Sequence, residues 1–361
     1  MNIHIQKIEE SKIGSVDINT VPFGSVFADH MFLADYEEGA WKNPRIVPYG
    51  PLSMSPSAMA LHYGQTIFEG MKAFKNTDGS VFISRIPDHN TRFNISAERM
   101  CMPTIPLEIF EAGLTELIAL DEKWIPTGEQ SSLYVRPCMY ATEEHVGVRP
   151  SKKYTFAIFT CPANVYYSKP LNVKVEKTYT RAVPGGTGFA KTGGNYAGSL
   201  LPTEKAKAEG FDQVIWTDGA THSKIEESGT MNLMFVIDGK ILTPALSDTI
   251  LKGITRDTIL MIARRKGIEV IERDIFVSEI EEAIKSKKLT EAFGTGTAVV
   301  VVPIQSISID GQKYEIEPGN TTSIVEEKSP SKSVASSIAE ELVKIRKGEL
   351  PDEFGWMKKI V

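Results

Sequence analysis

The sequence predicts a two-domain protein of the α+β class. Its 361 residues exceed the length that one hydrophobic core usually serves, and its 42% hydrophobic and 24% charged residues are ordinary globular proportions. Strand-like and helix-like patterns alternate along the chain, without an internal repeat or a low-complexity segment. We expect an N-terminal domain over residues 1–162, a connection over 163–188 and a C-terminal domain over 189–361.

The N-terminal domain is predicted to mix strands and helices. Runs rich in β-branched and aromatic residues predict strands, and apolar residues three and four positions apart predict helices. An Asp-Gly pair at 78–79 marks a hairpin between two of the strands. The predicted strands are 25–36, 71–74, 80–84, 132–139 and 154–161, and the predicted helices are 88–100 and 106–124.

The C-terminal domain is predicted to contain mainly antiparallel strands. The prolines and glycines of 163–188 are typical of a connection, and Asp-Gly pairs at 218–219 and 238–239 predict tight turns. Ser278 and Glu281 have the spacing of a capping box that opens a helix. The other predicted elements are a strand at 213–217 and helices at 200–209, 255–266 and 331–346.

Charge and cysteine content disfavour several classes of protein. Forty basic and 46 acidic residues give a formal net charge of −6 without a basic patch, which disfavours a nucleic-acid surface. Three widely spaced cysteines without a CxxC pattern suggest neither a disulfide framework nor a zinc site. The longest apolar run, 298–302, is too short to span a bilayer, and the charged N-terminus does not resemble a signal peptide. We expect a cytoplasmic protein with no metal, nucleic-acid or membrane partner.

The most unusual stretch is GGTGFAKTGGNYAGS, residues 185–199, which places Lys191 among glycines. Such a stretch is too flexible for an ordinary helix or strand, and it lets another group come close to the backbone. A desolvated lysine can lose its charge and attack a carbonyl to form a Schiff base. From this stretch alone, a solvated loop lysine is the simpler interpretation.

Two kinds of enzyme use a Schiff-base lysine, and they differ in what else is needed. An aldolase needs acid and base groups, whereas pyridoxal phosphate needs a carboxylate at its pyridine nitrogen, a donor at its phenolic oxygen and donors around its phosphate. Glu226 and Glu227 lie on a strand-like stretch, where alternation directs one side chain inward and one outward. Tyr196 offers the phenolic partner. Two solvated glutamates and a core tyrosine are the alternatives.

Two glycine-containing turns offer donors for a phosphate. Gly253, Ile254 and Thr255 come at the start of a predicted helix, where backbone N–H groups form an anion site. The GTGTA stretch at 294–298 adds the hydroxyl and the amide of Thr297. Each signal is weak by itself, because glycine-rich turns are usually only turns and neither stretch matches a P-loop or a dinucleotide-binding fingerprint.

These motifs together resemble those of the branched-chain amino acid aminotransferases, which have the type IV fold of pyridoxal phosphate enzymes. The resemblance runs from PFGSVFADHMF near residue 22 through LHYGQTIFEGMKAFK, SSLYVRP, FAKTGGNYAGS and ESGTMN to EAFGTGTA and FGWM. It implies a smaller N-terminal α/β domain and a larger C-terminal domain of mostly antiparallel strands with flanking helices.

The resemblance also implies roles for the residues around the cofactor. Lys191 is similar to the Schiff-base lysine and Tyr196 to the partner of the phenolic oxygen. Glu227, rather than Glu226, is similar to the partner of the pyridine nitrogen.

Further positions match the family's phosphate and substrate sites. Arg92, in HNTRF, is similar to the phosphate-binding arginine, which is joined by the backbone of Ile254 and Thr255 and by Thr297. The positions that match the substrate pocket are Phe23, Tyr63, Phe68, Tyr134, Arg136, Tyr166, Thr230 and Ala298.

The implied reaction is transamination between L-leucine, L-isoleucine or L-valine and 2-oxoglutarate, which gives branched-chain 2-oxo acids and L-glutamate. Glu227 would keep the pyridine nitrogen protonated, so that the ring accepts electrons when the substrate Cα proton leaves. Lys191 would move that proton. Because general-base catalysis supplies only about 10²–10⁴-fold, the electron sink and fixed geometry must supply most of the acceleration.

The resemblance further implies a homodimer with a shared active site. Residues 145–153, HVGVRPSKK, join two predicted strands and carry Val146 and Val148, although loop tips are normally polar. In the family a loop here enters the partner's substrate pocket, with Val148 at the matching contact. The alternative is that both valines fold back onto their own domain. Some animal members carry a CxxC where this chain has four valines, 299–302, so the associated thiol switch should be absent.

Two other functions remain open at this point. Another type IV enzyme, such as a D-amino acid aminotransferase or an aminodeoxychorismate lyase, would share the lysine and the glutamate but differ in its pocket. A catalytically silent protein would keep the fold as a binding module. The joint presence of Lys191, Glu227, Tyr196 and Arg92 argues against the silent protein.

Overall fold

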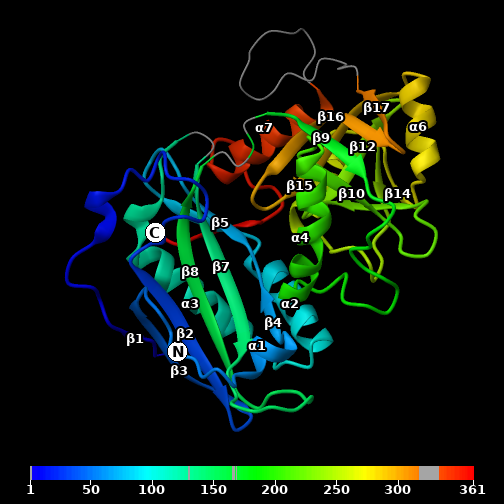
Figure 1. The fold of residues 1–361 in the computed structure, drawn as a ribbon. Helices are drawn as coiled ribbons and strands as arrows, with labels where there is room; N and C mark the ends of the chain where they lie inside the picture. The colour runs from blue at the N-terminus through cyan, green and yellow to red at the C-terminus, as the bar shows by residue number, and fades with distance from the viewer. Residues whose placement is uncertain (1, 129–130, 165–166, 168, 317–332) are drawn as a thin grey trace. The chain divides into compact units, whose positions relative to one another are not determined.

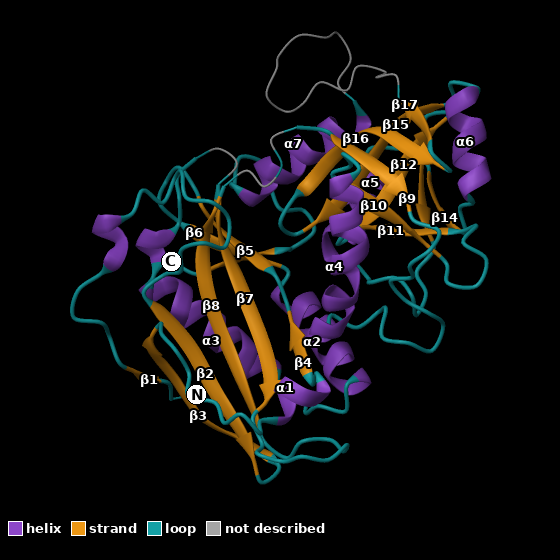
Figure 2. Cartoon of the chain, in the orientation of Figure 1, coloured by secondary structure: helices purple, strands orange, loops and turns teal. Residues whose placement is uncertain are grey.

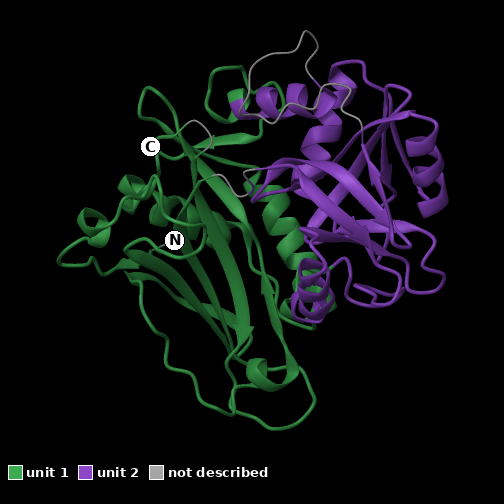
Figure 3. Cartoon of the chain, turned by 45° about the horizontal axis from the view of Figure 1, so that its top comes forward, with its two compact units in different colours: residues 1–166, 190–194, 344–361 green, residues 167–189, 195–343 purple. Residues whose placement is uncertain are grey.

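The computed structural model describes residues 2–128, 131–164, 167, 169–316 and 333–361. The chain forms two compact units, which Figure 3 distinguishes by colour. Unit 1 consists of residues 1–166, 190–194 and 344–361, and unit 2 consists of residues 167–189 and 195–343. The short segment 190–194, which contains Lys191, therefore belongs to unit 1 although both flanking segments belong to unit 2.

Unit 1 contains a nine-stranded sheet among its described residues (Figure 1). Its strands are β1 His4–Ile5, β2 His30–Glu37, β3 Ala40–Pro48, β4 Thr66–Phe68, β5 Met71–Lys75, β6 Val81–Ser84, β7 Ser132–Ala141, β8 Tyr154–Ala163 and β18 Met357–Lys359. Its helices are η1 Lys12–Ser15, α1 Met59–Tyr63, α2 Ile86–Arg99, α3 Leu107–Leu120 and η2 Glu122–Trp124.

The core of unit 1 lies between one face of this sheet and helices α2 and α3. The strand order is β1-β3-β2-β8-β7-β5-β6-β18, with β4 also paired to β7, and only the β1–β3 pair is parallel. Phe93 of α2 and Phe110 of α3 meet Phe156 of β8 with ring centroids 5.5 and 5.8 Å away. Because side chains alternate along a strand, strands such as β7 and β8 send every second residue into this core and the others to the opposite face.

Unit 2 contains a second nine-stranded sheet in the part of the chain that the structure describes (Figure 2). Its strands are β9 Leu171–Val175, β10 Gln213–Thr217, β11 Ile225–Ser228, β12 Met231–Ile237, β13 Lys240–Pro244, β14 Val270–Arg273, β15 Leu289–Gly296, β16 Val300–Ile309 and β17 Gln312–Glu315. Helices α5 Ile254–Arg265 and α6 Val277–Lys285 belong to it, while α4 Gly193–Ala208 and α7 Val334–Arg346 each continue across a unit boundary.

Antiparallel pairing dominates the sheet of unit 2. The order is β11-β10-β9-β16-β15-β12-β13-β14, with β17 beside β16 and a further β11–β12 pairing, and the parallel pairs are β9–β10, β9–β16 and β13–β14. The additional pairing matters for the site, because it gives β11 hydrogen-bonded neighbours on both sides. Within the described ranges, no helix combines the length and apolar character needed to cross a bilayer.

The structure confirms the mixed α+β class and corrects three local predictions. Strand β9 lies inside the segment predicted as a connection, since Leu171–Val175 alternates buried and half-buried residues between the prolines. Helix α4 begins at Gly193 rather than near residue 200, and a Cβ on Gly193 would lie 2.6 Å from Thr66 Oγ1, so the glycine lets the start of the helix lie close to β4. Helix α6 begins at Val277 without a side-chain cap, so the predicted capping box at Ser278 is wrong.

Candidate active site

The backbone of Lys191 is fixed on both sides within unit 1. Its N–H donates to Ser96 Oγ of α2 at 2.9 Å, and its carbonyl accepts a hydrogen bond from the N–H of Phe68 in β4 at 3.0 Å. The next residue, Thr192, forms a β-bridge with Ile67, and its hydroxyl donates to the carbonyl of Thr66 at 2.7 Å. A glycine-flanked segment is therefore tied to an ordered strand and helix.

The side chain of Lys191 belongs to a group of five residues that we call the Lys191 cluster. Its Nζ lies 4.8 Å from the ring centroid of Phe68, and Cζ of Arg136 lies 4.7 Å from the same centroid. Arg136 donates from Nη2 to Tyr134 Oη at 2.9 Å, and the ring of Phe23 meets that of Tyr134 edge-on at 4.9 Å. Two cations thus share one aromatic ring, which is a favourable contact for each of them.

A glycine makes the position of Tyr134 possible. A Cβ built on Gly70 would lie 2.0 Å from Tyr134 Oη, which no real side chain tolerates. The Glu-Gly pair at 69–70 in the motif TIFEGMK therefore has a packing reason, since the glycine leaves room for the tyrosine hydroxyl that Arg136 binds.

Arg92 is held by a buried carboxylate that no local sequence pattern indicates, that of Glu69. Arg92 donates from Nε to Glu69 Oε1 at 2.6 Å and from Nη2 to Oε2 at 2.7 Å, and His89 Nδ1 lies 2.8 Å from Oε2. Burial alone would raise the pKa of Glu69, but the charges of Arg92 and His89 hold it well below its ordinary value. Ser96 links this ion pair to Lys191, because its hydroxyl also donates to the carbonyl of Arg92 at 3.0 Å.

The other predicted residues of unit 1 lie elsewhere. Among the described residues, the contacts that define the Lys191 cluster do not extend to Tyr63 or Val148. Tyr63 ends α1 and packs against the hydrophobic core, whereas Val148 lies in the β7–β8 loop with 90% of its surface exposed. The predicted pocket residue Tyr166 lies outside the described residues.

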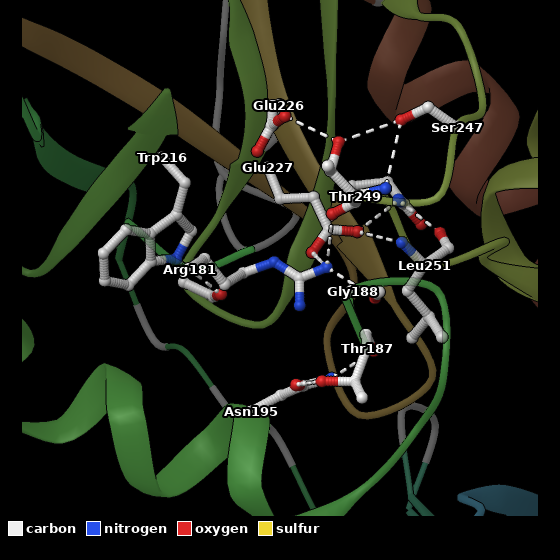
Figure 4. Close-up of polar contacts among 12 residues, drawn as sticks. Arg181, Thr187, Gly188, Asn195, Trp216, Glu226, Glu227, Ser247, Thr249 and Leu251 are labelled. Carbon is white, nitrogen blue, oxygen red and sulfur yellow. Dashed lines mark hydrogen bonds and ion pairs between the residues drawn. The ribbon is translucent and has the colours of Figure 1, made fainter. Parts of the chain in front are cut away.

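In unit 2, the carboxylate of Glu227 is held by three donors (Figure 4). Its Oε1 accepts from the Leu251 N–H at 2.9 Å and from Asn232 Nδ2 at 3.1 Å, and its Oε2 lies 2.8 Å from Arg181 Nη2. Arg181 also donates to the carbonyls of Gly188 and Thr249, so the guanidinium itself is fixed. A charge-assisted network of this kind keeps both oxygens of the glutamate in one place.

Glu226 and Glu227 are both buried, so the alternative of two solvated glutamates is wrong. Their exposed fractions are 7% and 4%. Residues 249–251 contact both side chains, since Thr249 binds Glu226 and Leu251 binds Glu227. Thr249 Oγ1 donates to Glu226 Oε1 at 2.6 Å, and burial raises the pKa of Glu226.

The segments on either side of Lys191 are tied to each other in unit 2 (Figure 4). Thr187 Oγ1 donates to Asn195 Oδ1 at 2.7 Å, and Asn195 Nδ2 donates back to the Thr187 carbonyl at 2.8 Å. Tyr196 follows in the first turn of α4 and is half-buried. This reciprocal pair closes the loop that carries the lysine.

The predicted phosphate donors occupy two turns of unit 2. Helix α5 begins at Ile254 after an N-cap glycine, so the N–H groups of Ile254 and Thr255 belong to its positive end. A Cβ on Gly253 would lie 1.9 Å from Asn232 Oδ1, so a glycine here also allows Asn232 to reach Glu227. Thr297 and Ala298 form the turn between β15 and β16.

Thr230, a predicted pocket residue, lies near that second turn. It is exposed in the β11–β12 turn, and its carbonyl oxygen lies 3.8 Å from the position of a Cβ built on Gly296. The described residues contain no group of three or more His, Cys, Asp or Glu side chains arranged to hold a metal ion.

Comparison with known proteins agrees with this geometry. The family model described as amino-transferase class IV matches residues 66–307. Branched-chain-amino-acid aminotransferase 2 of Bacillus subtilis is 42% identical over 98% of this chain and 96% of its own. The crystal structure of the Escherichia coli branched-chain amino acid aminotransferase matches with a TM-score of 0.74 and 26% identity, covering 92% of this chain and 99% of that one.

A further structural neighbour was solved in complex with a ligand. The T.th. branched-chain amino acid aminotransferase in complex with N-(5'-phosphopyridoxyl)-L-glutamate is 26% identical, with a TM-score of 0.71 over 91% of this chain and 98% of its own. The chain belongs to the class IV aminotransferases.

Proposed function

We propose that this chain is a branched-chain aminotransferase, which transfers the amino group of L-leucine, L-isoleucine or L-valine to 2-oxoglutarate. The observation that carries the proposal is the Lys191 cluster, because it places an amine beside an apolar ring and next to a guanidinium–phenol pair. Relatives of more than 40% identity over nearly the whole chain carry the name of this activity.

The donor set of the chain fits pyridoxal phosphate. Glu227 offers a buried carboxylate for the pyridine nitrogen, and Tyr196 offers a phenol for the cofactor's own phenolic oxygen. The N-terminus of α5, Thr297 and Arg92 offer backbone, hydroxyl and guanidinium donors for the phosphate. When bound, the cofactor supplies an electron sink for the electron pair that the substrate Cα keeps when its proton leaves.

The residues of the chain then supply positioning and proton transfer. With the cofactor bound, Lys191 would hold it through the side-chain amine, and the same amine, once free, would take the proton from the substrate Cα. Glu227, fixed by three donors, would hold a proton at the pyridine nitrogen. The ring of Phe68 lies beside the lysine amine and keeps water from it on that side.

The cluster also accounts for a site that accepts two kinds of substrate. The rings of Phe23 and Phe68 suit an aliphatic side chain, while Arg136 and the Tyr134 hydroxyl suit the second carboxylate of glutamate or 2-oxoglutarate. Alternate use of one site by two substrates gives ping-pong kinetics.

We propose further that the enzyme is a homodimer whose partner receives the β7–β8 loop. The base of this loop is pinned, because Arg149 binds Glu143 through Nη2–Oε1 and Nη1–Oε2 contacts of 2.7 and 3.1 Å. Above the base, Val146 and Val148 are 76% and 90% exposed, which disfavours the alternative that they fold back onto their own unit. Burying each valine is worth roughly 1.5–3 kcal/mol, so a second copy of the chain is a suitable partner.

The Val148→Asp variant tests the shared site. We expect it to raise the KM for L-leucine while cofactor binding, followed by absorbance, stays as in the wild type. Unchanged kinetics, or full activity in a monomer verified by light scattering, would refute the shared site.

A chiral assay tests the proposed activity. We expect turnover of L-leucine with 2-oxoglutarate and none of D-alanine. Turnover of D-alanine alone would favour a D-amino acid aminotransferase, and absence of both activities with bound cofactor would favour a lyase.

We place the enzyme in the cytoplasm, since Cys101, Cys138 and Cys161 are all free thiols.

A further inference from the structure

Two buried cations lie on the face of the unit 1 sheet that carries Tyr134. Lys72 of β5 is in register with Tyr134 of β7, so alternation directs both side chains away from the hydrophobic core. Arg346, the last residue of α7, covers the same face, with Cζ 5.4 Å from the ring centroid of Phe74. The exposed fractions of Lys72 and Arg346 are only 5% and 7%.

Arg346 has buried donors that lack acceptors. No hydrogen-bond acceptor among the described residues meets its Nε or Nη1. Its charged neighbours are cations: burial and the charge of Arg346 lower the pKa of Lys72 to about 7, while burial and the charge of Arg85 lower the pKa of Arg346 to about 10. A buried guanidinium with unsatisfied donors destabilises the folded chain unless something else supplies the acceptors.

Other buried arginines of the described chain show the usual arrangement. Arg92 pairs with Glu69, Arg181 with Glu227 and Arg256 with Glu272. Each of these three arginines has a carboxylate partner within the chain. Arg346 differs from all three, because no ion pair to a carboxylate is found for it among the described residues, where its Nε and Nη1 also lack acceptors.

We infer that Arg346 and Lys72 form a subsite for a small carboxylate beside Tyr134. The planar guanidinium binds both carboxylate oxygens, and the ammonium of Lys72 adds a second positive charge. Because Tyr134 is in register with Lys72 and accepts from Arg136, the subsite adjoins the Lys191 cluster. The inference rests on the proposed function in one respect, namely that the carboxylate is that of the amino acid or 2-oxo acid. Alternatively, the carboxylate that binds in this subsite belongs to a separate carboxylic acid.

Calorimetric titration of the holoenzyme with 4-methylvaleric acid at pH 7 tests the subsite. This acid has a carboxylate and a branched chain but no amino group, so it binds without reacting. We expect the Arg346→Gln variant to bind it at least about tenfold more weakly than the wild type, because the charge-assisted contact is lost. We also expect the neutral amide of the same acid to bind both proteins equally. Equal affinity of the acid for both proteins would overturn the inference.

Thermal unfolding separates a ligand-binding role from a structural one. We expect Arg346→Met to keep or raise the melting temperature without ligand and to abolish the rise caused by 4-methylvaleric acid. Arg256→Met is the matched control, since Arg256 is also buried but is paired with a carboxylate, and it should lower the melting temperature. If Arg346→Met lowers it as much and the acid still stabilises the variant, Arg346 is structural and the inference fails.

Steady-state kinetics identifies the source of the carboxylate. A raised KM for L-leucine in Arg346→Gln, with kcat retained, assigns the subsite to the substrate. An unchanged KM together with lost binding of 4-methylvaleric acid assigns it to a separate carboxylic acid. If the wild type does not turn over L-leucine, the proposed function fails, whereas the titration still decides whether the subsite exists.

Discussion

The two units hold their central residues in opposite ways. Lys191 in unit 1 is fixed through its backbone, by Ser96 on one side and Phe68 on the other. Glu227 in unit 2 is fixed through its carboxylate, by Asn232, Leu251 and Arg181. To transfer a proton, the amine of a lysine must move while the Cα stays in place. To stabilise a charge, a carboxylate must have its oxygen atoms held in place. The manner of anchoring therefore indicates the task.

Removing the amine of Lys191 should have the largest effect. In Lys191→Ala we expect leucine aminotransferase activity to fall by at least about 10³-fold, because both the covalent anchor and the general base are lost. The measurement is a coupled assay of L-glutamate formation. Lys205→Ala, at an exposed position of α4, is the control and should keep full activity; a similar loss there would indicate a nonspecific effect.

Neutralising the carboxylate of Glu227 should have the next largest effect on kcat. We expect Glu227→Gln to retain the cofactor and to lower kcat by about 10²-fold or more, since an amide does not favour a protonated pyridine. Glu226→Gln is the neighbouring control. Because burial already raises the pKa of Glu226, its neutral amide should change kcat little. The reverse ranking of the two variants would show that the wrong glutamate has been chosen.

Removing one of the partners that fix the Glu227 carboxylate should have a smaller effect on kcat than neutralising the carboxylate. In Arg181→Met, Glu227 loses one charge-assisted partner, and we expect kcat to fall by about tenfold, the equivalent of about 1.4 kcal/mol. The variant should also unfold at a lower temperature, because a buried carboxylate loses its counterion. A normal kcat would indicate that Asn232 and Leu251 suffice to fix the carboxylate.

Loosening the backbone of Lys191 should have the smallest effect. Ser96→Ala removes the acceptor of the Lys191 N–H, which costs about 1–3 kcal/mol of stability when the donor stays buried. We expect a lower melting temperature and a severalfold loss of kcat, with the carbonyl contact to Phe68 still in place. If activity fell as far as in Lys191→Ala, the backbone contact would have a larger role than anchoring.

The sequence predicted the fold class and the main elements better than the contacts. Hydrophobic periodicity identified most strands and helices, but it missed β3, because Ala40–Pro48 contains two prolines and buries little beyond Ile46. It also missed β9, whose five residues stand among prolines and glycines. Short or weakly patterned strands become recognisable only when their neighbours in the sheet are known.

The partners of the site residues were beyond the reach of sequence patterns. Glu69 lies 23 residues from Arg92, and Ser96 lies 95 residues from Lys191, so no local spacing connects either pair. Arg181 lies in a stretch that composition marks only as a connection. Such long-range polar contacts depend on how the elements pack, whereas Lys191 itself was conspicuous because its glycine neighbours are a local signal.

The central claim is that Lys191 carries the cofactor, and the position of a reduced adduct tests it most directly. The holoenzyme is treated with borohydride, digested, and searched by mass spectrometry for a phosphopyridoxyl group on each lysine. We expect a single modified peptide, containing Lys191. Lys72 is the informative rival, since it is the buried lysine whose pKa falls to about 7. A phosphopyridoxyl group on Lys72, or on any lysine other than Lys191, would contradict the account.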